Sequence, residues 1–195
     1  AGQRLVALAR WDDDWGNASR DFDLLLFDSG LNLVAVGGDE QSGGSGQYPF
    51  EAIIYTAPAT GTYLLAIFHS GGAIPAWLQL NAFSGQTLGV ATAATSIVNP
   101  AESANAGMLA VGAAFWGATS TIESFSSQGP SVDGRTKPEI VGVDGADSVT
   151  YGPSGFFGTS QASPHVAGLA ALVFEQFPSF TPVQAADYLK DNALP

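Results

Sequence analysis

A short Gly-Thr-Ser turn that runs directly into an apolar helix constrains this chain more than any other stretch. The turn is Gly158-Thr159-Ser160, and the Ala- and Gly-rich residues 162–174 that follow it predict a helix. A serine at that place lies where free backbone N–H groups and the positive end of the helix dipole favour negative charge. Ser160 is therefore a candidate nucleophile for acyl transfer, with its own N–H helping to hold the oxyanion. The alternative is that Ser160 only caps the helix, the usual role of serine at such a position.

Further motifs precede this turn. Residues 125–130 read Phe-Ser-Ser-Gln-Gly-Pro, and residues 133–140 contain Asp-Gly-Arg-x-Lys-Pro-Glu-Ile. Asn-Pro-Ala at 99–101 stands before the apolar run 108–113. Together with Gly158–Gly168, these motifs resemble the subtilisin-like serine proteases (subtilases), over about residues 96–195. The resemblance covers only the C-terminal half of a subtilase catalytic domain. It implies an α/β fold with a parallel sheet, a polypeptide substrate and Ser160 as the catalytic nucleophile.

The charge balance of the chain limits its possible partners. The net charge is −12, with six Lys and Arg residues against eighteen Asp and Glu. Nucleic-acid binding needs clustered basic side chains, so we expect no nucleic-acid partner. No apolar run approaches the roughly 20 residues that span a bilayer, so we expect no membrane span. The acidic composition suits a soluble, secreted extracellular protein or a cation-binding one. The absence of cysteine says little about the compartment. No signal peptide is recognisable at residue 1, which suggests that it was removed or that the chain is a piece of a longer protein.

The sequence changes character near residue 90, which predicts two domains, 1–90 and 91–195. Short alternating apolar runs with Gly, Pro and Asp between them predict an antiparallel β-sandwich for residues 1–90. The predicted strands are residues 5–11, 22–27, 31–36, 50–55, 63–68 and 77–83. This part also resembles, more loosely, the small jelly-roll-like modules that accompany many secreted proteases.

Strand and helix patterns alternate after residue 90. Residues 109–113 and 140–143 are short apolar runs typical of buried parallel strands. The helix that Ser160 opens is small and apolar on every face, which predicts a central, fully packed helix. Thr181 as N-cap, Pro182 at the first helical position and Gln184 at the capping-box position predict a second helix, ending near residue 191.

A serine hydrolase also needs a base and an acid that orients it, and the chain has two histidines. His165 lies five residues into the nucleophile helix and has a structural role in the family. Asp28, His69 and Ser160 follow the chain order of a subtilase triad. However, Asp28-Ser29-Gly30 is also a common hairpin turn, and His69 stands at a strand end without the Gly and Thr that flank the family's histidine. We interpret this order as coincidental.

The interpretation that fits both halves is a protease fragment with an inserted β-sandwich. The catalytic Asp and His and the oxyanion Asn would then lie upstream of Ala1, because Asn81, Asn99 and Asn105 lack the expected flanks. The isolated chain would be inactive, and its uncovered half-domain would self-associate. The alternative is a non-catalytic binding module in residues 1–90 attached to a vestigial protease segment.

Three further groups have a plain and a functional interpretation. An acidic cluster could bind Ca²⁺, but it lacks EF-hand spacing, so we favour a solvated acidic loop. Four tryptophans could form a sugar- or peptide-binding face, but core packing is the commoner role. Two cations are expected at the surface or in salt bridges. The acidic cluster is Asp12, Asp13, Asp14, Asp21 and Asp23; the tryptophans are Trp11, Trp15, Trp77 and Trp116; the cations are Arg135 and Lys137.

Overall fold

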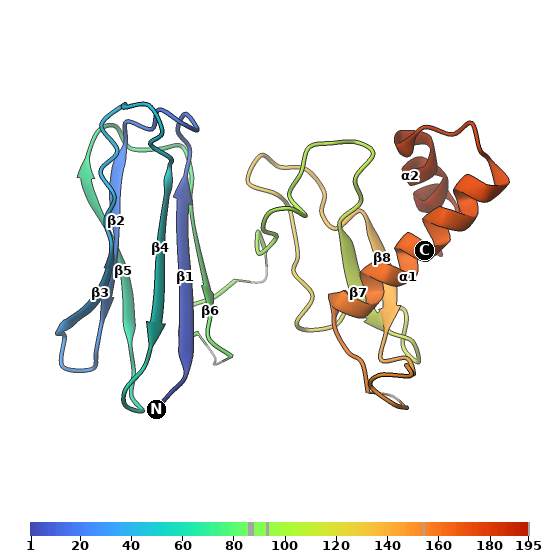
Figure 1. Ribbon diagram of the computed structural model, residues 1–195, viewed down its shortest axis with the longest axis horizontal. Helices are drawn as coiled ribbons and strands as arrows, with labels where there is room; N and C mark the ends of the chain where they lie inside the picture. Colours follow the sequence, from blue (N-terminus) through green and yellow to red (C-terminus); the bar gives the residue numbers. More distant parts are fainter. Residues whose placement is uncertain (86–87, 93, 154, 195) are drawn as a thin grey trace. The chain divides into compact units, whose positions relative to one another are not determined.

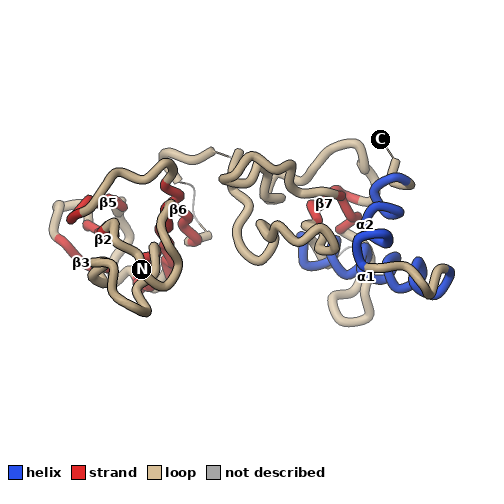
Figure 2. Tube along the Cα trace, turned by 90° about the horizontal axis from the view of Figure 1, so that it is seen from above, coloured by secondary structure: helices blue, strands red, loops and turns tan. Residues whose placement is uncertain are grey.

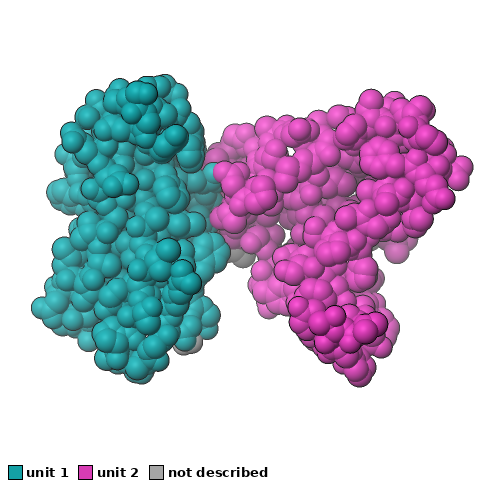
Figure 3. Space-filling view, viewed as in Figure 1, with its two compact units in different colours: residues 1–90 teal, residues 91–195 magenta. Residues whose placement is uncertain are grey.

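The chain forms two compact units, Ala1–Val90 and Ala91–Pro195, coloured separately in Figure 3. The structure is a computed structural model that describes residues 1–194 except 86, 87, 93 and 154. Figure 2 shows that unit 1 is built from strands, whereas both helices belong to unit 2.

Unit 1 consists of two antiparallel three-stranded sheets (Figure 1). One sheet has the order β4-β1-β6 and the other β3-β2-β5. The strands are β1 (Arg4–Trp11), β2 (Asp21–Phe27), β3 (Leu33–Gly37), β4 (Phe50–Thr56), β5 (Leu64–Gly71) and β6 (Leu78–Phe83). All six strands predicted for residues 1–90 are present, with ends shifted by three residues or fewer.

Alternation of side chains builds the core of unit 1. On β2, Phe22, Leu24 and Leu26 are buried while the residues between them are partly exposed, which is the period of two of a strand with one covered face. Leu24 and Leu26 from one sheet meet Ala7, Ala9 and Ile53 from the other in a single apolar cluster. Burial of these side chains between the sheets supplies the main apolar stabilisation of the unit.

Unit 2 contains a parallel strand pair with a helix across it. β7 (Val111–Phe115) pairs in parallel with β8 (Ile140–Asp144), in the register Val111↔Ile140 to Phe115↔Asp144. The chain then enters α1 (Thr159–Gln176), which packs against both strands and lies over them in Figure 1. The family resemblance predicted this α/β arrangement, and the apolar runs at 109–113 and 140–143 mark its strands.

The helix α2 (Pro182–Asp191) has the predicted boundaries, and its cap is complete. The Thr181 side chain accepts a hydrogen bond from the Gln184 N–H at 3.3 Å. In return, the Thr181 N–H donates to the Gln184 side chain at 2.8 Å. Both bonds satisfy backbone and side-chain groups at the exposed first turn, as a capping box does.

The helix α1 is not fully packed, so the prediction of a helix buried on every face is wrong for this chain. Val166 and Val173 face the β7–β8 pair and α2 in an apolar cluster. Leu169 and Leu172 are 52% and 61% exposed. A helix that is apolar all round is buried on every face only if other elements cover every face. Within unit 2, the β7–β8 pair and α2 cover one face of α1.

Among the residues that the structure describes, no helix is long and apolar enough to cross a membrane.

Candidate active site

Ser160 is the second residue of α1, and its side chain is exposed. The N-cap is Gly158, whose carbonyl accepts hydrogen bonds from the N–H groups of Gln161 at 2.9 Å and Ala162 at 3.2 Å. The alternative of Ser160 as the cap is therefore wrong. The first N–H groups of a helix have no acceptor within the helix, so the Ser160 N–H at the second position is not used for an intrahelical hydrogen bond. This is the arrangement that a nucleophile with a backbone oxyanion donor needs.

The backbone at Gly158 explains why a glycine precedes the serine. Its φ is 120° and its ψ is 160°, a combination that residues with a Cβ rarely adopt. This conformation turns the chain sharply from the loop into the helix. The turn thereby brings Ser160 to the exposed end of α1.

Three contacts tie this turn to the carboxyl end of β8. The Gly158 N–H donates to Oδ2 of Asp144 at 2.7 Å. The Gln161 side chain accepts from the Ala146 N–H at 3.0 Å and donates to the Ala146 carbonyl at 3.1 Å. Because Ser160 lies between Gly158 and Gln161, it is bracketed by residues that are anchored to one strand end.

Close packing of α1 on β8 fixes the same geometry. A Cβ added to Gly142 would lie 2.5 Å from the Ala162 carbonyl oxygen, so only glycine lets the helix approach this closely. Ala162 itself is fully buried. The first turn of α1 is thus fixed by close packing on β8 as well as by hydrogen bonds.

His165 is turned away from Ser160. Five residues of helix rotate a side chain by roughly 140° about the axis. The His165 Nδ1 lies 2.9 Å from the Val143 carbonyl oxygen on β8. This contact is consistent with the structural role that the resemblance assigns to His165.

Asp28 and His69 are not brought together. Phe27, next to Asp28, pairs with Leu64 at one end of the β2–β5 ladder, and Phe22 pairs with His69 near the other end. The intervening strand is roughly 17 Å long at 3.3–3.4 Å per residue. The His69 ring stacks on Phe22, with centroids 4.6 Å apart. An acid cannot orient a base over that distance, so these two residues do not form a dyad.

Asp28 instead organises a turn. Its Oδ1 accepts hydrogen bonds from the N–H groups of Gly30 at 2.8 Å and Asn32 at 3.0 Å. Bonds from the Asn32 side chain, the Asn32 N–H and the Gly30 N–H hold the pKa of Asp28 below its usual value. This is the hairpin-turn role that Asp-Ser-Gly indicated in the sequence.

Several carboxylates of the acidic cluster of unit 1 make internal contacts. Asp13 accepts from the N–H groups of Ser19 and Arg20, each at 2.7 Å. Burial raises the pKa of Asp13, but backbone N–H bonds and the charge of Arg20 outweigh it and leave the pKa lowered. Asp12 forms an ion pair with Arg20, and Asp21 accepts from the Gln41 N–H. The described part of the chain contains no group of three or more His, Cys, Asp or Glu residues that could hold a metal ion.

The two singled-out cations of unit 2 both form ion pairs. Arg135 binds Asp133 through Nε at 2.8 Å and lowers the pKa of that carboxyl to about 2. Lys137 pairs with Glu139 and is buried. These ion pairs stabilise the loops before β8, in agreement with the expected salt-bridge role of both residues.

The tryptophans divide between core and surface. Trp11 is fully buried against Phe22 and donates to the Arg20 carbonyl at 3.0 Å. Trp15 and Trp116 are both 57% exposed, so core packing is the wrong expectation for these two. Trp77 is half-buried beneath Arg10. Trp15 and Trp116 belong to different units, each beside one aromatic neighbour, Tyr48 and Phe115 respectively.

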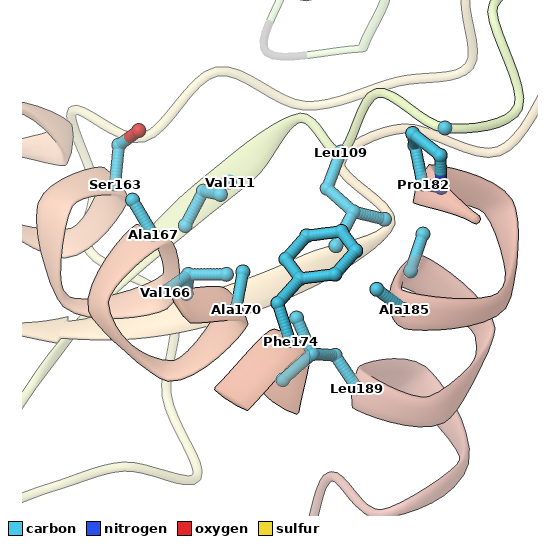
Figure 4. Close-up of a pocket in the computed structure, with 12 residues that line it drawn as sticks. Leu109, Val111, Ser163, Val166, Ala167, Ala170, Phe174, Pro182, Ala185 and Leu189 are labelled. Carbon is cyan, nitrogen blue, oxygen red and sulfur yellow. The ribbon is translucent and has the colours of Figure 1, made fainter. Parts of the chain in front are cut away.

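A groove of about 180 Å³ lies beside α1, away from Ser160. Phe174 of α1, Leu109 and the α2 residues Ala185 and Leu189 line it, and Ser163 stands at its rim (Figure 4). Apart from Ser163 its lining is apolar, and the described lining residues include no titratable side chain. The groove therefore offers no acid or base for catalysis.

Comparison with known proteins agrees with this geometry. The model of the subtilase family matches residues 84–194, a stretch that includes β7, β8, both helices and the Ser160 turn. The chain belongs to the subtilase family. No solved structure gives a significant match.

Several curated members of the family are similar to part of this chain. Subtilisin BL from Lederbergia lenta is 40% identical over 100 residues, which is 51% of this chain and 35% of that protein. Serine protease AprX from Bacillus subtilis is 35% identical over 89 residues, 37% of this chain and 20% of AprX. Alkaline elastase YaB from a Bacillus strain is 52% identical over 42 residues, 22% of this chain and 11% of that protein. The chain thus spans at most about a third of the length of these relatives.

Sequence reasoning missed two residues of this site, Asp144 and Gln161. Both are buried, and both contact the loop or turn next to Ser160. One signal was available for Asp144: a lone carboxylate ends the apolar run 140–143, at the carboxyl end of a parallel strand, where functional groups of α/β sheets gather. Gln161 has no comparable signal, because a glutamine in the first turn of a helix is ordinarily solvated.

Proposed function

We propose that this chain carries the nucleophile of a secreted subtilisin-like serine endopeptidase. Ser160 attacks the carbonyl carbon of a peptide bond in a polypeptide substrate, and its own N–H stabilises the oxyanion. The peptide C–N bond then breaks, the amine leaves with a proton, and water hydrolyses the acyl-serine. The observation that carries the proposal is the placement of Ser160 at the exposed N-terminus of α1, within the region that matches the subtilase family.

The base, its orienting carboxylate and the side-chain oxyanion donor are proposed to come from polypeptide upstream of Ala1. Supporting this, His165 is turned onto the Val143 carbonyl, and Asp28 and His69 sit at opposite ends of one strand pair. Without a base, the Ser160 hydroxyl is an ordinary alcohol and the chain alone is inactive. The upstream polypeptide is thus a partner as well as a part of the enzyme.

Unit 1 is proposed to be a jelly-roll-like β-sandwich inserted into the protease domain. Its two antiparallel sheets share one apolar cluster, in agreement with a sandwich. The unit ends at Val90, close to the start of the family match at residue 84.

The test is hydrolysis of a fluorogenic peptide by the chain alone and by the chain joined to the polypeptide that naturally precedes it. We expect turnover only in the second preparation, and loss of several orders of magnitude in Ser160→Ala. Ser163→Ala is the matched control, since Ser163 lies on the same helix but lines the apolar groove. Equal activity of wild type and Ser160→Ala would refute the assignment, and absence of turnover in both preparations would favour a binding role for unit 1.

A further inference from the structure

The Asp144 side chain occupies an unusual position at the end of β8. It is fully buried, and its Oδ2 accepts the Gly158 N–H at 2.7 Å. Among the described residues, its Oδ1 is buried with no hydrogen-bond partner. A buried carboxylate with an unused acceptor costs stability, because its hydration is lost without full replacement. Groups that cost stability in this way are concentrated at functional sites.

The partner of Asp144 is the residue on which the Ser160 turn depends. Gly158 is the N-cap of α1 and has the glycine-specific backbone conformation that aims the chain into the helix. A hydrogen bond to a carboxylate is shorter and stronger than one to a neutral oxygen. The bond to Asp144 therefore fixes the peptide group that sets the direction of the first turn.

Asp144 is itself rigidly placed. Asp144 pairs with Phe115 across the parallel ladder. The backbone carbonyl of Asp144 accepts a hydrogen bond from the Trp116 N–H at 3.0 Å. The adjacent Gly145 has a φ of 72° and would bring an added Cβ to 2.6 Å from the Phe115 ring. The carboxylate is thus carried by the strand pair and not by a free loop.

We propose that Asp144 is a positioning residue for the nucleophile: by holding the Gly158 N–H from the end of β8, it orients Ser160 and its N–H at the start of α1. The effect on reaction rate rests on the proposed function of Ser160. The anchoring of Gly158 does not.

The first measurement is amide hydrogen exchange of Gly158 by NMR in the full chain. We expect Asp144→Ala to accelerate it by about tenfold or more, because the Gly158 N–H loses its hydrogen-bond acceptor. Asp144→Asn should retain most of the protection, because its amide oxygen can still accept. The matched control is Glu102→Ala, which removes another buried carboxylate of unit 2 that accepts the Val132 N–H at 3.0 Å, outside the Ser160 turn.

The second measurement is the rate at which a fluorophosphonate labels Ser160 when the natural upstream polypeptide is present. We expect Asp144→Ala to lower this rate by about 10- to 100-fold, the effect of a misplacement near 1 Å. Asp144→Asn should restore most of it, and Glu102→Ala should leave it near wild type. If Asp144→Ala does not fold, Asp144→Asn decides: its Gly158 amide proton signal should shift while that of Glu102→Gln does not.

The outcomes separate the two claims. Unchanged Gly158 exchange in Asp144→Ala, or the same acceleration in Glu102→Ala, would overturn the anchor. Faster Gly158 exchange in Asp144→Ala together with an unchanged labelling rate of Ser160 would overturn the positioning role. A wild type that no preparation labels would count against the proposed function, and Gly158 exchange would still decide the anchor.

Discussion

The side chain of Gln161 and the backbone of Ala146 form a closed pair of hydrogen bonds, 3.0 and 3.1 Å long. Gln161 is 5% exposed, so both bonds are shielded from water. We expect Gln161→Ala to destabilise unit 2 by about 1–3 kcal/mol, because the two Ala146 backbone groups would lose their partner in a buried place. Urea unfolding of unit 2 measures this difference.

The control for that variant is Gln176→Ala, at the exposed end of the same helix. A surface substitution of this kind should change the unfolding free energy by no more than about 0.5 kcal/mol. Equal effects of the two variants would show that the Gln161–Ala146 pair contributes nothing specific.

Replacement by alanine should change stability in opposite directions at Gly142 and Gly168. Alanine at Gly142 places a Cβ 2.5 Å from the Ala162 carbonyl, and this contact forces α1 away from β8. We expect Gly142→Ala to cost about 1–3 kcal/mol, as overpacking does. Gly168→Ala meets nothing within 4 Å and should stabilise the chain by about 0.5–1 kcal/mol through helix propensity. Thermal unfolding of both variants tests the pair, and destabilisation by Gly168→Ala would contradict the packing described for α1.

Glu51 should make unit 1 less stable as the pH rises. Burial raises the pKa of Glu51 above its ordinary value of 4.5, against the opposing bonds from Gln41 and the Asp39 N–H. The folded state therefore binds the proton more tightly than the unfolded state, so this stabilisation is complete below pH 4.5 and is lost as the pH rises through the raised pKa.

The variant Glu51→Gln removes that titration. Its unfolding free energy relative to wild type should increase between pH 4 and pH 7, when urea unfolding is followed on β4 amide signals. The exposed Glu40→Gln serves as control, and as a surface substitution it should change the unfolding free energy by no more than about 0.5 kcal/mol. A difference between Glu51→Gln and wild type that stays constant with pH would argue against a raised pKa of Glu51.

The uncovered face of α1 should drive self-association of the isolated chain. Leu169 and Leu172 are three residues apart on the helix, and both are more than half exposed. Replacing both with Glu should shift the chain toward monomer in sedimentation velocity, whereas Val149→Glu, at a fully exposed loop position, should not. A wild-type chain that sediments as a stable monomer at high concentration would contradict this prediction.

Local sequence chemistry was sufficient to predict the secondary structure. Alternating apolar runs between turn residues predicted the strands of unit 1, and Thr181 with Gln184 predicted the start of α2, because both signals involve neighbouring residues only. The placement of Ser160 at a helix N-terminus followed from the Gly-Thr-Ser turn for the same reason.

Contacts between distant residues could not be predicted in that way. Asp144 and Gly158 are fourteen positions apart and meet only because α1 folds back over β8. The exposure of Leu169 likewise depends on which elements cover α1, and composition does not report it. The flanks of Asp28 and His69 already indicated that their triad-like order is coincidental, and the strand register adds that the two residues lie far apart.

The most direct test of the account is to locate a fluorophosphonate adduct by peptide mapping. The chain is labelled alone and together with its natural upstream polypeptide, and the modified serine is identified by mass spectrometry. The account predicts an adduct on Ser160 only when the upstream polypeptide is present, with Ser163 unmodified in both samples. An adduct on Ser160 in the isolated chain, or on another serine in the combined sample, would contradict it.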